Sequence, residues 1–123
     1  MNVVDSSGWL AYFANDANAV QFAPIIQATN SLLVPTICMY EVFKRILIQR
    51  GEEDALQAVG IMSLGTKVEL TQEIAINAAQ ISSTSKLAMA DSIILATART
   101  SKATLWTQDA DFEGMEGVEY IAK

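Results

Sequence analysis

Short apolar runs of strand length alternate with segments of helical periodicity along the whole chain. The runs that indicate strands are residues 2–5, 32–35, 67–70, 104–107 and 118–121. The segments that indicate helices are residues 8–14, 17–29, 36–49, 52–64, 71–83 and 89–101. Such alternation is typical of β–α–β units, because two parallel strands need a long crossover connection. The sequence therefore predicts an α/β fold, with a mostly parallel central sheet of roughly four to five short strands flanked by helices.

Polar residues at the ends of these segments predict where individual helices begin. Ser6 or Ser7 is the expected N-cap of the first helix, because a side-chain oxygen there can accept from a free backbone amide. Thr36 and Thr71 are the expected caps of two later helices. The tetrad Ser82 to Ser85 is predicted to form a loop.

The overall composition indicates a single folded domain. The chain has 123 residues, of which 51% are hydrophobic and 18% charged, and these values exclude intrinsic disorder. No apolar run approaches the roughly 18 residues that a membrane span needs, and the first residues lack the basic flank of a secretory signal. The single cysteine, Cys38, suits a reducing compartment. We therefore expect one domain over residues 1–123, in the cytoplasm and away from membranes.

The chain contains no histidine. A Ser-His-Asp triad and a Cys-His pair are therefore excluded. The usual zinc sites also need histidine or several cysteines, so they are excluded as well. Proton transfer near neutral pH would have to use carboxylates, lysine or metal-bound water.

Acidic residues follow the predicted strands at the points where sites form in open α/β sheets. Asp5 closes the first strand, Glu41 lies on the helix after the second, and Asp109 follows the fourth. Asp91 lies in the first turn of a helix. Carboxylates held close together repel each other, and a hard cation such as Mg²⁺ or Mn²⁺ relieves that repulsion. The pattern predicts a divalent-metal site, although acids in such positions are also common as simple helix caps or solvated residues.

The net charge is −6, from 14 acidic and 8 basic residues. An acidic chain is not the usual form of a nucleic-acid-binding protein, which presents a basic patch. This objection is weaker if several of the acids hold metal ions, because bound cations reverse the local charge.

Four stretches carry motifs in a fixed order. They are Val3-Val4-Asp5-Ser6-Ser7, then Val34-Pro35-Thr36 with Tyr40-Glu41-Val42 and Lys44, then Met89-Ala90-Asp91-Ser92-Ile93-Ile94-Leu95-Ala96-Thr97-Ala98, and last Leu105-Trp106-Thr107-Gln108-Asp109-Ala110-Asp111-Phe112. Together they resemble the PIN-domain family, and in particular the VapC-type toxins of type II toxin–antitoxin systems. The resemblance covers essentially the whole chain and implies a PIN-like three-layer fold.

The resemblance implies a Mg²⁺- or Mn²⁺-dependent endoribonuclease that hydrolyses RNA with metal-activated water. The acidic quartet of the family corresponds to the residues Asp5, Glu41, Asp91 and Asp109. Asp111 matches a further acidic position, as an outer or alternative ligand, and Ser6 and Thr107 match hydroxyl positions that orient carboxylates or water. The family also implies a homodimer and inhibition by an antitoxin on a separate chain.

Two lysines are candidates for RNA contact. Lys44 follows Glu41 by three residues, so it could either pair with that carboxylate or face a phosphate. Lys86 precedes the third motif, at a position where a histidine is expected in many members of the family.

Two other functions remain open on the sequence alone. A receiver-type signalling domain suits the length and the α/β alternation, but it needs an acidic pair after the first strand, and Asp5 is followed by Ser6. A haloacid-type phosphatase is weaker still, because it needs an Asp-x-Asp after the first strand, and here Asp5 is followed by Ser6 and Ser7. A catalytically silent PIN-like interaction module is the second alternative, and the intact quartet argues against it.

Overall fold

The computed structural model describes all 123 residues, and it begins and ends on strands of one sheet. The strands are β1 (Asn2–Val4), β2 (Leu32–Pro35), β3 (Thr66–Val68), β4 (Thr104–Thr107) and β5 (Val118–Tyr120). The α-helices are α1 (Ser6–Ala14), α2 (Ala19–Gln27), α3 (Thr36–Arg50), α4 (Glu52–Met62), α5 (Gln72–Ser85) and α6 (Met89–Thr100). Two short 3₁₀ helices, η1 (Thr29–Ser31) and η2 (Ala110–Phe112), complete the chain.

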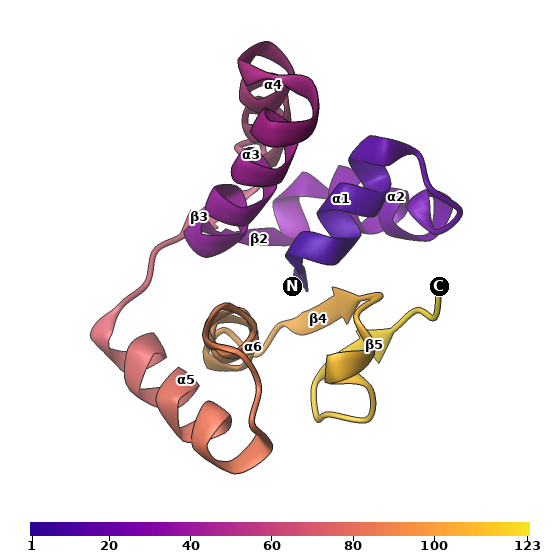
Figure 1. The fold of residues 1–123 in the computed structure, drawn as a ribbon. Helices are drawn as coiled ribbons and strands as arrows, with labels where there is room; N and C mark the ends of the chain where they lie inside the picture. Colours follow the sequence, from indigo (N-terminus) through magenta and orange to yellow (C-terminus); the bar gives the residue numbers. More distant parts are fainter.

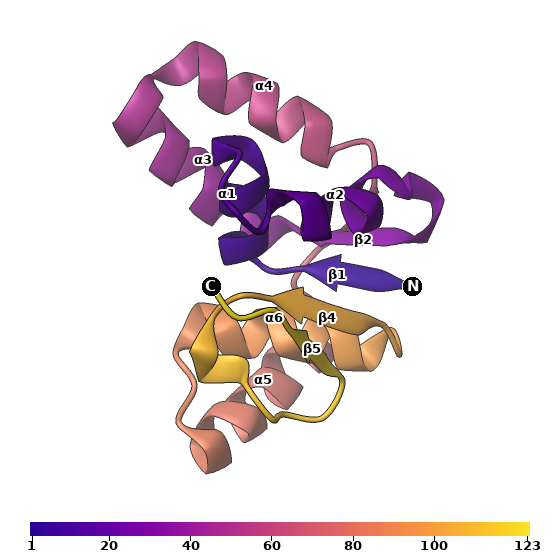
Figure 2. The same ribbon diagram turned by 90° about the vertical axis from the view of Figure 1, so that its right-hand side faces the viewer.

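All five strands pair in parallel, in the order β3-β2-β1-β4-β5. Helices α1 to α4 lie on one side of the sheet, and α5 and α6 lie on the other (Figures 1 and 2). The predicted α/β fold, with a parallel sheet of five short strands between helical layers, is therefore confirmed. Its strand order differs from the order 2-1-3-4-5 of receiver-type domains, so the receiver alternative is excluded.

The strand order determines where a site can form. The chain leaves β1 toward β2 on one side, whereas β4 returns to the other side of β1. The carboxyl ends of β1 and β4 therefore flank the switch point of the sheet, where ligands bind in open α/β folds. Asp5 directly follows β1, and Asp109 lies two residues beyond the end of β4.

The core consists of one cluster of 22 buried hydrophobic residues around the central strands. Val3, Val34 and Leu105 are fully buried in it. Helix α1 lies close against this core because residue 8 is glycine: a Cβ there would lie 2.6 Å from Val4 Cγ1. A smaller cluster of four residues joins α5 to α6.

Two of the expected helix caps are wrong. The N-cap of α1 is Asp5, whose carboxylate accepts from the Gly8 amide, and Ser6 is already helical. Thr36 is likewise the first residue of α3 rather than its cap, which is Pro35. The third expectation is confirmed, because the Thr71 hydroxyl accepts from the Ile74 amide.

The tetrad Ser82–Ser85 is the last turn of α5 rather than the predicted loop. Ser83, Thr84 and Ser85 donate to carbonyls one turn earlier, as Ser85 does to Ile81 at 2.6 Å, whereas Ser82 donates to the Leu87 carbonyl beyond the helix. These bonds satisfy the hydroxyls without interrupting the helix. The helix ends instead at Lys86, which adopts a left-handed conformation with φ of 61°. None of the helices combines the length and the apolar character needed to cross a membrane.

Candidate active site

A cleft of about 390 Å³ opens at the carboxyl ends of β1 and β4. Its walls come from the start of α1, the middle of α3, the start of α6 and the segment after β4. It is lined by Asp5, Ser6, Ser7, Leu10, Tyr40, Glu41, Lys44, Arg45, Ile48, Asp91 and Asp109. The structure thus brings the four predicted carboxylates, from segments far apart in the chain, into one cleft: Asp5, Glu41, Asp91 and Asp109.

Asp5 lies at the bottom of this cleft and is only 2% exposed. Its carboxylate accepts hydrogen bonds from the Gly8 amide at 3.0 Å and from the Thr107 hydroxyl at 2.8 Å. The Ser7 hydroxyl, 2.8 Å from Oδ1, donates to the same carboxylate. Burial raises the pKa of Asp5 from 3.8 to about 6, although these donors act in the opposite direction. Asp5 is therefore rigidly held while its negative charge remains incompletely compensated.

The α3 wall of the cleft presents Glu41, which is half-buried. The Ser6 hydroxyl donates to Glu41 Oε1 at 2.6 Å. Successive serines at the start of α1 therefore reach different acids, because Ser6 contacts Glu41 and Ser7 contacts Asp5. The other oxygen of Glu41 accepts no hydrogen bond from the protein.

Across the cleft, Asp91, Asp109 and Asp111 form a second acidic group. One carboxylate oxygen from each of the three lies within 4.8 Å of the others, close enough to share one cation. Asp109 is the cap of η2 and accepts from the Asp111 amide at 2.9 Å. Its own amide donates to the Thr107 hydroxyl, which connects this group to Asp5. Asp111 itself is exposed and does not line the cleft.

The electrostatics of this group favour a bound cation. Burial, together with the negative charges of Asp109, Asp5, Glu41 and Asp111, raises the pKa of Asp91 from 3.8 to about 6. No hydrogen-bond donor of the protein contacts the Asp91 carboxylate. Hard oxygen ligands in this arrangement match the preferences of Mg²⁺ and Mn²⁺. The donor set therefore fits a divalent metal ion.

The basic residues near the cleft differ in position. Lys44 and Arg45 line it, and the Lys44 ammonium lies 5.8 Å from the centre of the Tyr40 ring. Lys44 makes no salt bridge with Glu41, so the pairing considered from the spacing is absent. Lys86 is exposed at the end of α5 and does not line the cleft.

Cys38 lies behind the site and is fully buried. Burial, followed by the charge of Asp5, raises the pKa of this thiol well above its usual value. A thiol that stays protonated and buried is not a nucleophile. Cys38 is therefore a small core residue.

Sequence reasoning missed two residues of the site. Ser7 was considered only as a helix cap, yet it donates to Asp5. Its position two residues after an aspartate at a helix start was the available signal, because such side chains lie close to each other. Arg45 was not among the candidates for RNA contact, yet it lines the cleft beside Lys44.

A parallel sheet of this order, with an acidic cleft at its switch point, is the architecture that the sequence motifs implied. The sequence matches the model of the family described as PIN domain over residues 3–118. The protein therefore belongs to the PIN-domain family, as the motifs had suggested. No curated protein sequence matches the chain.

Solved structures with the same fold cover nearly the entire chain. A chain of a toxin–antitoxin complex from Klebsiella pneumoniae is 25% identical, with a TM-score of 0.80 over 98% of this chain and 100% of that one. VapC20 from Mycobacterium tuberculosis, a toxin that cleaves the sarcin–ricin loop, is 17% identical, with a TM-score of 0.79 over 97% of this chain and 98% of that one. FitAcB from Neisseria gonorrhoeae is 17% identical, with a TM-score of 0.75 over 98% and 97%.

Proposed function

We propose that this PIN domain is a Mg²⁺- or Mn²⁺-dependent endoribonuclease and the toxin of a type II toxin–antitoxin pair. The observation that carries the proposal is the convergence of Asp5, Glu41, Asp91 and Asp109 in one cleft at the switch point of the sheet. The similar structures support the toxin class, since one is a toxin–antitoxin complex and another is a toxin that cleaves the sarcin–ricin loop.

In this proposal Asp91 and Asp109 would hold a divalent metal ion, with Asp111 within reach as an additional or outer ligand. Asp5 would complete the site from the other wall of the cleft. Glu41, on the same wall as Asp5, would act on the attacking water rather than on the ion. A divalent ion in such a site lowers the pKa of a coordinated water and stabilises charge on a phosphodiester.

The surrounding residues position these carboxylates for hydrolysis. Thr107 and Ser7 hold Asp5 through their hydroxyls, so that its orientation is set before substrate binds. Ser6 holds Oε1 of Glu41, which leaves Oε2 to orient the attacking water and accept its proton. The water oxygen would bond to phosphorus while the bond to the leaving sugar oxygen breaks, and that oxygen would take up a proton from solvent.

Binding of RNA to this acidic protein should be modest and sensitive to salt. Lys44 and Arg45 are the basic side chains at the cleft and are the proposed phosphate contacts. Lys86 lies further away and would contact only a longer substrate. We also propose that residues 1–123 act as one domain in the cytoplasm, as a homodimer that a separate antitoxin chain inhibits.

The test is cleavage of a mixed cellular RNA pool by the purified protein, with Mn²⁺ or Mg²⁺, with EDTA, and with the variant Asp91→Asn. Cleavage by the wild type that stops in EDTA is expected. The variant should lose more than about a hundredfold in rate, since even outer partners of metal ligands contribute 10- to 100-fold. Full metal-dependent cleavage by Asp91→Asn would refute the mechanism. Absence of both cleavage and Mn²⁺ binding would instead indicate a silent interaction module.

A further inference from the structure

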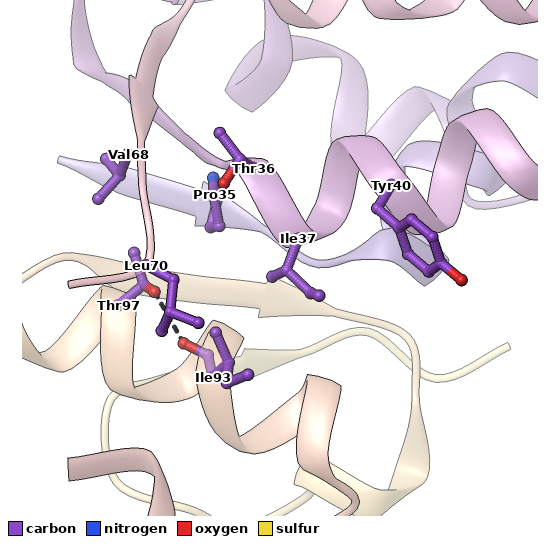
Figure 3. Close-up of a pocket in the computed structure, with 8 residues that line it drawn as sticks. All are labelled: Pro35, Thr36, Ile37, Tyr40, Val68, Leu70, Ile93 and Thr97. Atoms are coloured by element: carbon purple, nitrogen blue, oxygen red, sulfur yellow. Dashed lines mark hydrogen bonds between the residues drawn. The ribbon is translucent and has the colours of Figure 1, made fainter. Parts of the chain in front are cut away.

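A second cavity, of about 320 Å³, opens beside the acidic cleft. It lies between the start of α3, the segment after β3 and α6. Figure 3 shows its apolar lining, in which Ile37 of α3 lies above Ile93 of α6 and Leu70 lies to one side, with Pro35 next to Thr36 at the top of the view. Unlike the cleft, this pocket contains no charged side chain.

Tyr40 belongs to both cavities, and it lies next to Glu41 in the chain. Tyr40 is 60% exposed, so its ring is accessible to a ligand from solvent. Figure 3 shows its ring at the edge of the pocket, with the hydroxyl pointing away from the other labelled residues. On the cleft side, the Lys44 ammonium lies 5.8 Å from the ring centre. An aromatic face, a cation and the acidic cleft are therefore adjacent.

The pocket also contains one polar group that is free to bind a ligand. The Thr97 hydroxyl donates to the Ile93 carbonyl at 2.7 Å, as the dashed line in Figure 3 marks. The Thr36 hydroxyl, by contrast, has no hydrogen-bond partner within the protein. An apolar pocket with a free hydroxyl in its wall can accept a flat, partly polar group and hydrogen-bond to its edge.

We propose that this pocket and Tyr40 bind an unpaired nucleobase next to the phosphate that lies in the acidic cleft. The inference deepens the proposed ribonuclease function and rests on it. Tyr40 would stack on the face of the base, Thr36 would contact its edge, and Lys44 would contact the connecting phosphate. Because paired bases have both faces covered, such a subsite selects single-stranded or looped RNA.

The test is the binding of two fluorescein-labelled probes by the full chain in Mn²⁺, measured by fluorescence anisotropy. One probe is octauridylate, checked on a gel to be intact, and the other is a sugar–phosphate chain of the same length without bases. Tyr40→Ala should weaken octauridylate binding about tenfold, as loss of one stacking platform does. It should leave binding of the chain without bases unchanged. Tyr40→Phe should bind both probes as the wild type does.

The matched control is Leu56→Ala on α4, which removes a side chain of similar exposure, 56% against 60% for Tyr40, outside both cavities. It should bind both probes as the wild type does. Equal effects of Tyr40→Ala on the two probes, or no effect on either, would overturn the proposal. So would a change from dimer to monomer in sedimentation of Tyr40→Ala, since the pocket would then belong to an interface with a second copy. Binding does not require cleavage, so a wild type that binds octauridylate through Tyr40 but cleaves no RNA would refute the nuclease and retain the subsite.

Discussion

Asp5 and Asp91 lie in the same cleft, and the pKa of each is raised to about 6 with burial as the largest cause, yet their surroundings are opposite. The Asp5 carboxylate accepts from the Gly8 amide and from the hydroxyls of Ser7 and Thr107. The Asp91 carboxylate accepts from no donor and faces other carboxylates. The protein thus orients one acid itself and leaves the charge of the other to a cation. The protein therefore fixes the orientation of Asp5 on one wall of the cleft, whereas Asp91 on the other wall needs a metal ion to balance its charge.

The largest expected effect is the change in the free energy of unfolding when Asp5 is replaced by asparagine. A carboxyl with a pKa raised from 3.8 to about 6 binds more protons in the folded state between these values. The free energy of unfolding should therefore fall as pH rises from about 4 to about 6 and stay low above that range. Asp5→Asn removes this cost, so in EDTA at pH 7.5 it should raise the free energy of unfolding by up to about 3 kcal/mol. Near pH 4 it should give little gain.

Urea denaturation at the two pH values measures this difference. The control is Glu53→Gln, which neutralises an exposed carboxylate in the first turn of α4 and should not stabilise the protein. Added Mn²⁺ should reduce the difference in free energy of unfolding between Asp5→Asn and the wild type, because it binds and stabilises the folded wild type. A gain for Asp5→Asn that is the same at pH 4 and pH 7.5 would contradict the origin assigned to it.

The next effect concerns the hydroxyl that joins the two walls. Thr107 donates to Asp5 at 2.8 Å and accepts from the Asp109 amide at 2.9 Å. Thr107→Val keeps the volume but removes both bonds, so Mn²⁺ affinity in a calorimetric titration should fall 10- to 100-fold. Thr107→Ser should restore most of it. The control is Thr97→Val on α6, where an equally buried hydroxyl bonds only to its own helix. If Thr97→Val lowered Mn²⁺ affinity as much, loss of any buried hydroxyl would explain the result, and the link between Asp5 and Asp109 would not.

The smallest effect separates the two serines of α1. Ser7→Ala leaves Asp5 with its bonds to Thr107 and Gly8, so Mn²⁺ affinity should fall only a few-fold. Ser6→Ala frees Glu41 and should lower the rate of RNA cleavage, by up to about tenfold, at unchanged Mn²⁺ affinity. The two variants are compared by titration and by cleavage rate. If Ser6→Ala and Ser7→Ala changed Mn²⁺ affinity and cleavage rate in the same way, the separate roles assigned to the two serines would be wrong.

The sequence predicted the parts of the site that depend on topology. Acids placed just after parallel strands must meet at one edge of the sheet, so Asp5 and Asp109 could be placed together before the structure was known. The motif predicted that Ser6 orients a carboxylate or water, but not which acid each serine reaches. Both serines simply follow Asp5, and only the helix geometry turns Ser6 toward Glu41 and Ser7 toward Asp5.

The errors at the helix ends have a common cause. Serine and threonine can cap a helix, lie within it or form a loop, and which of these occurs depends on the nearby backbone groups that lack hydrogen-bond partners. Asp5 displaced both serines as the cap of α1, because its carboxylate reaches the Gly8 amide. In the last turn of α5, by contrast, serine hydroxyls found carbonyls of their own helix, so the predicted loop remained helical.

The Asp5 cap gives the protein a spectroscopic reporter. The amide proton of Gly8 points directly at Asp5 Oδ1, with a nitrogen–oxygen distance of 3.0 Å, so its NMR frequency responds to protonation of that carboxylate. Glycine amides resonate in a distinct region of a ¹⁵N correlation spectrum, and the chain contains only six glycines. One resonance at the start of α1 can therefore follow the charge state of the cleft in solution, without any label in the site itself.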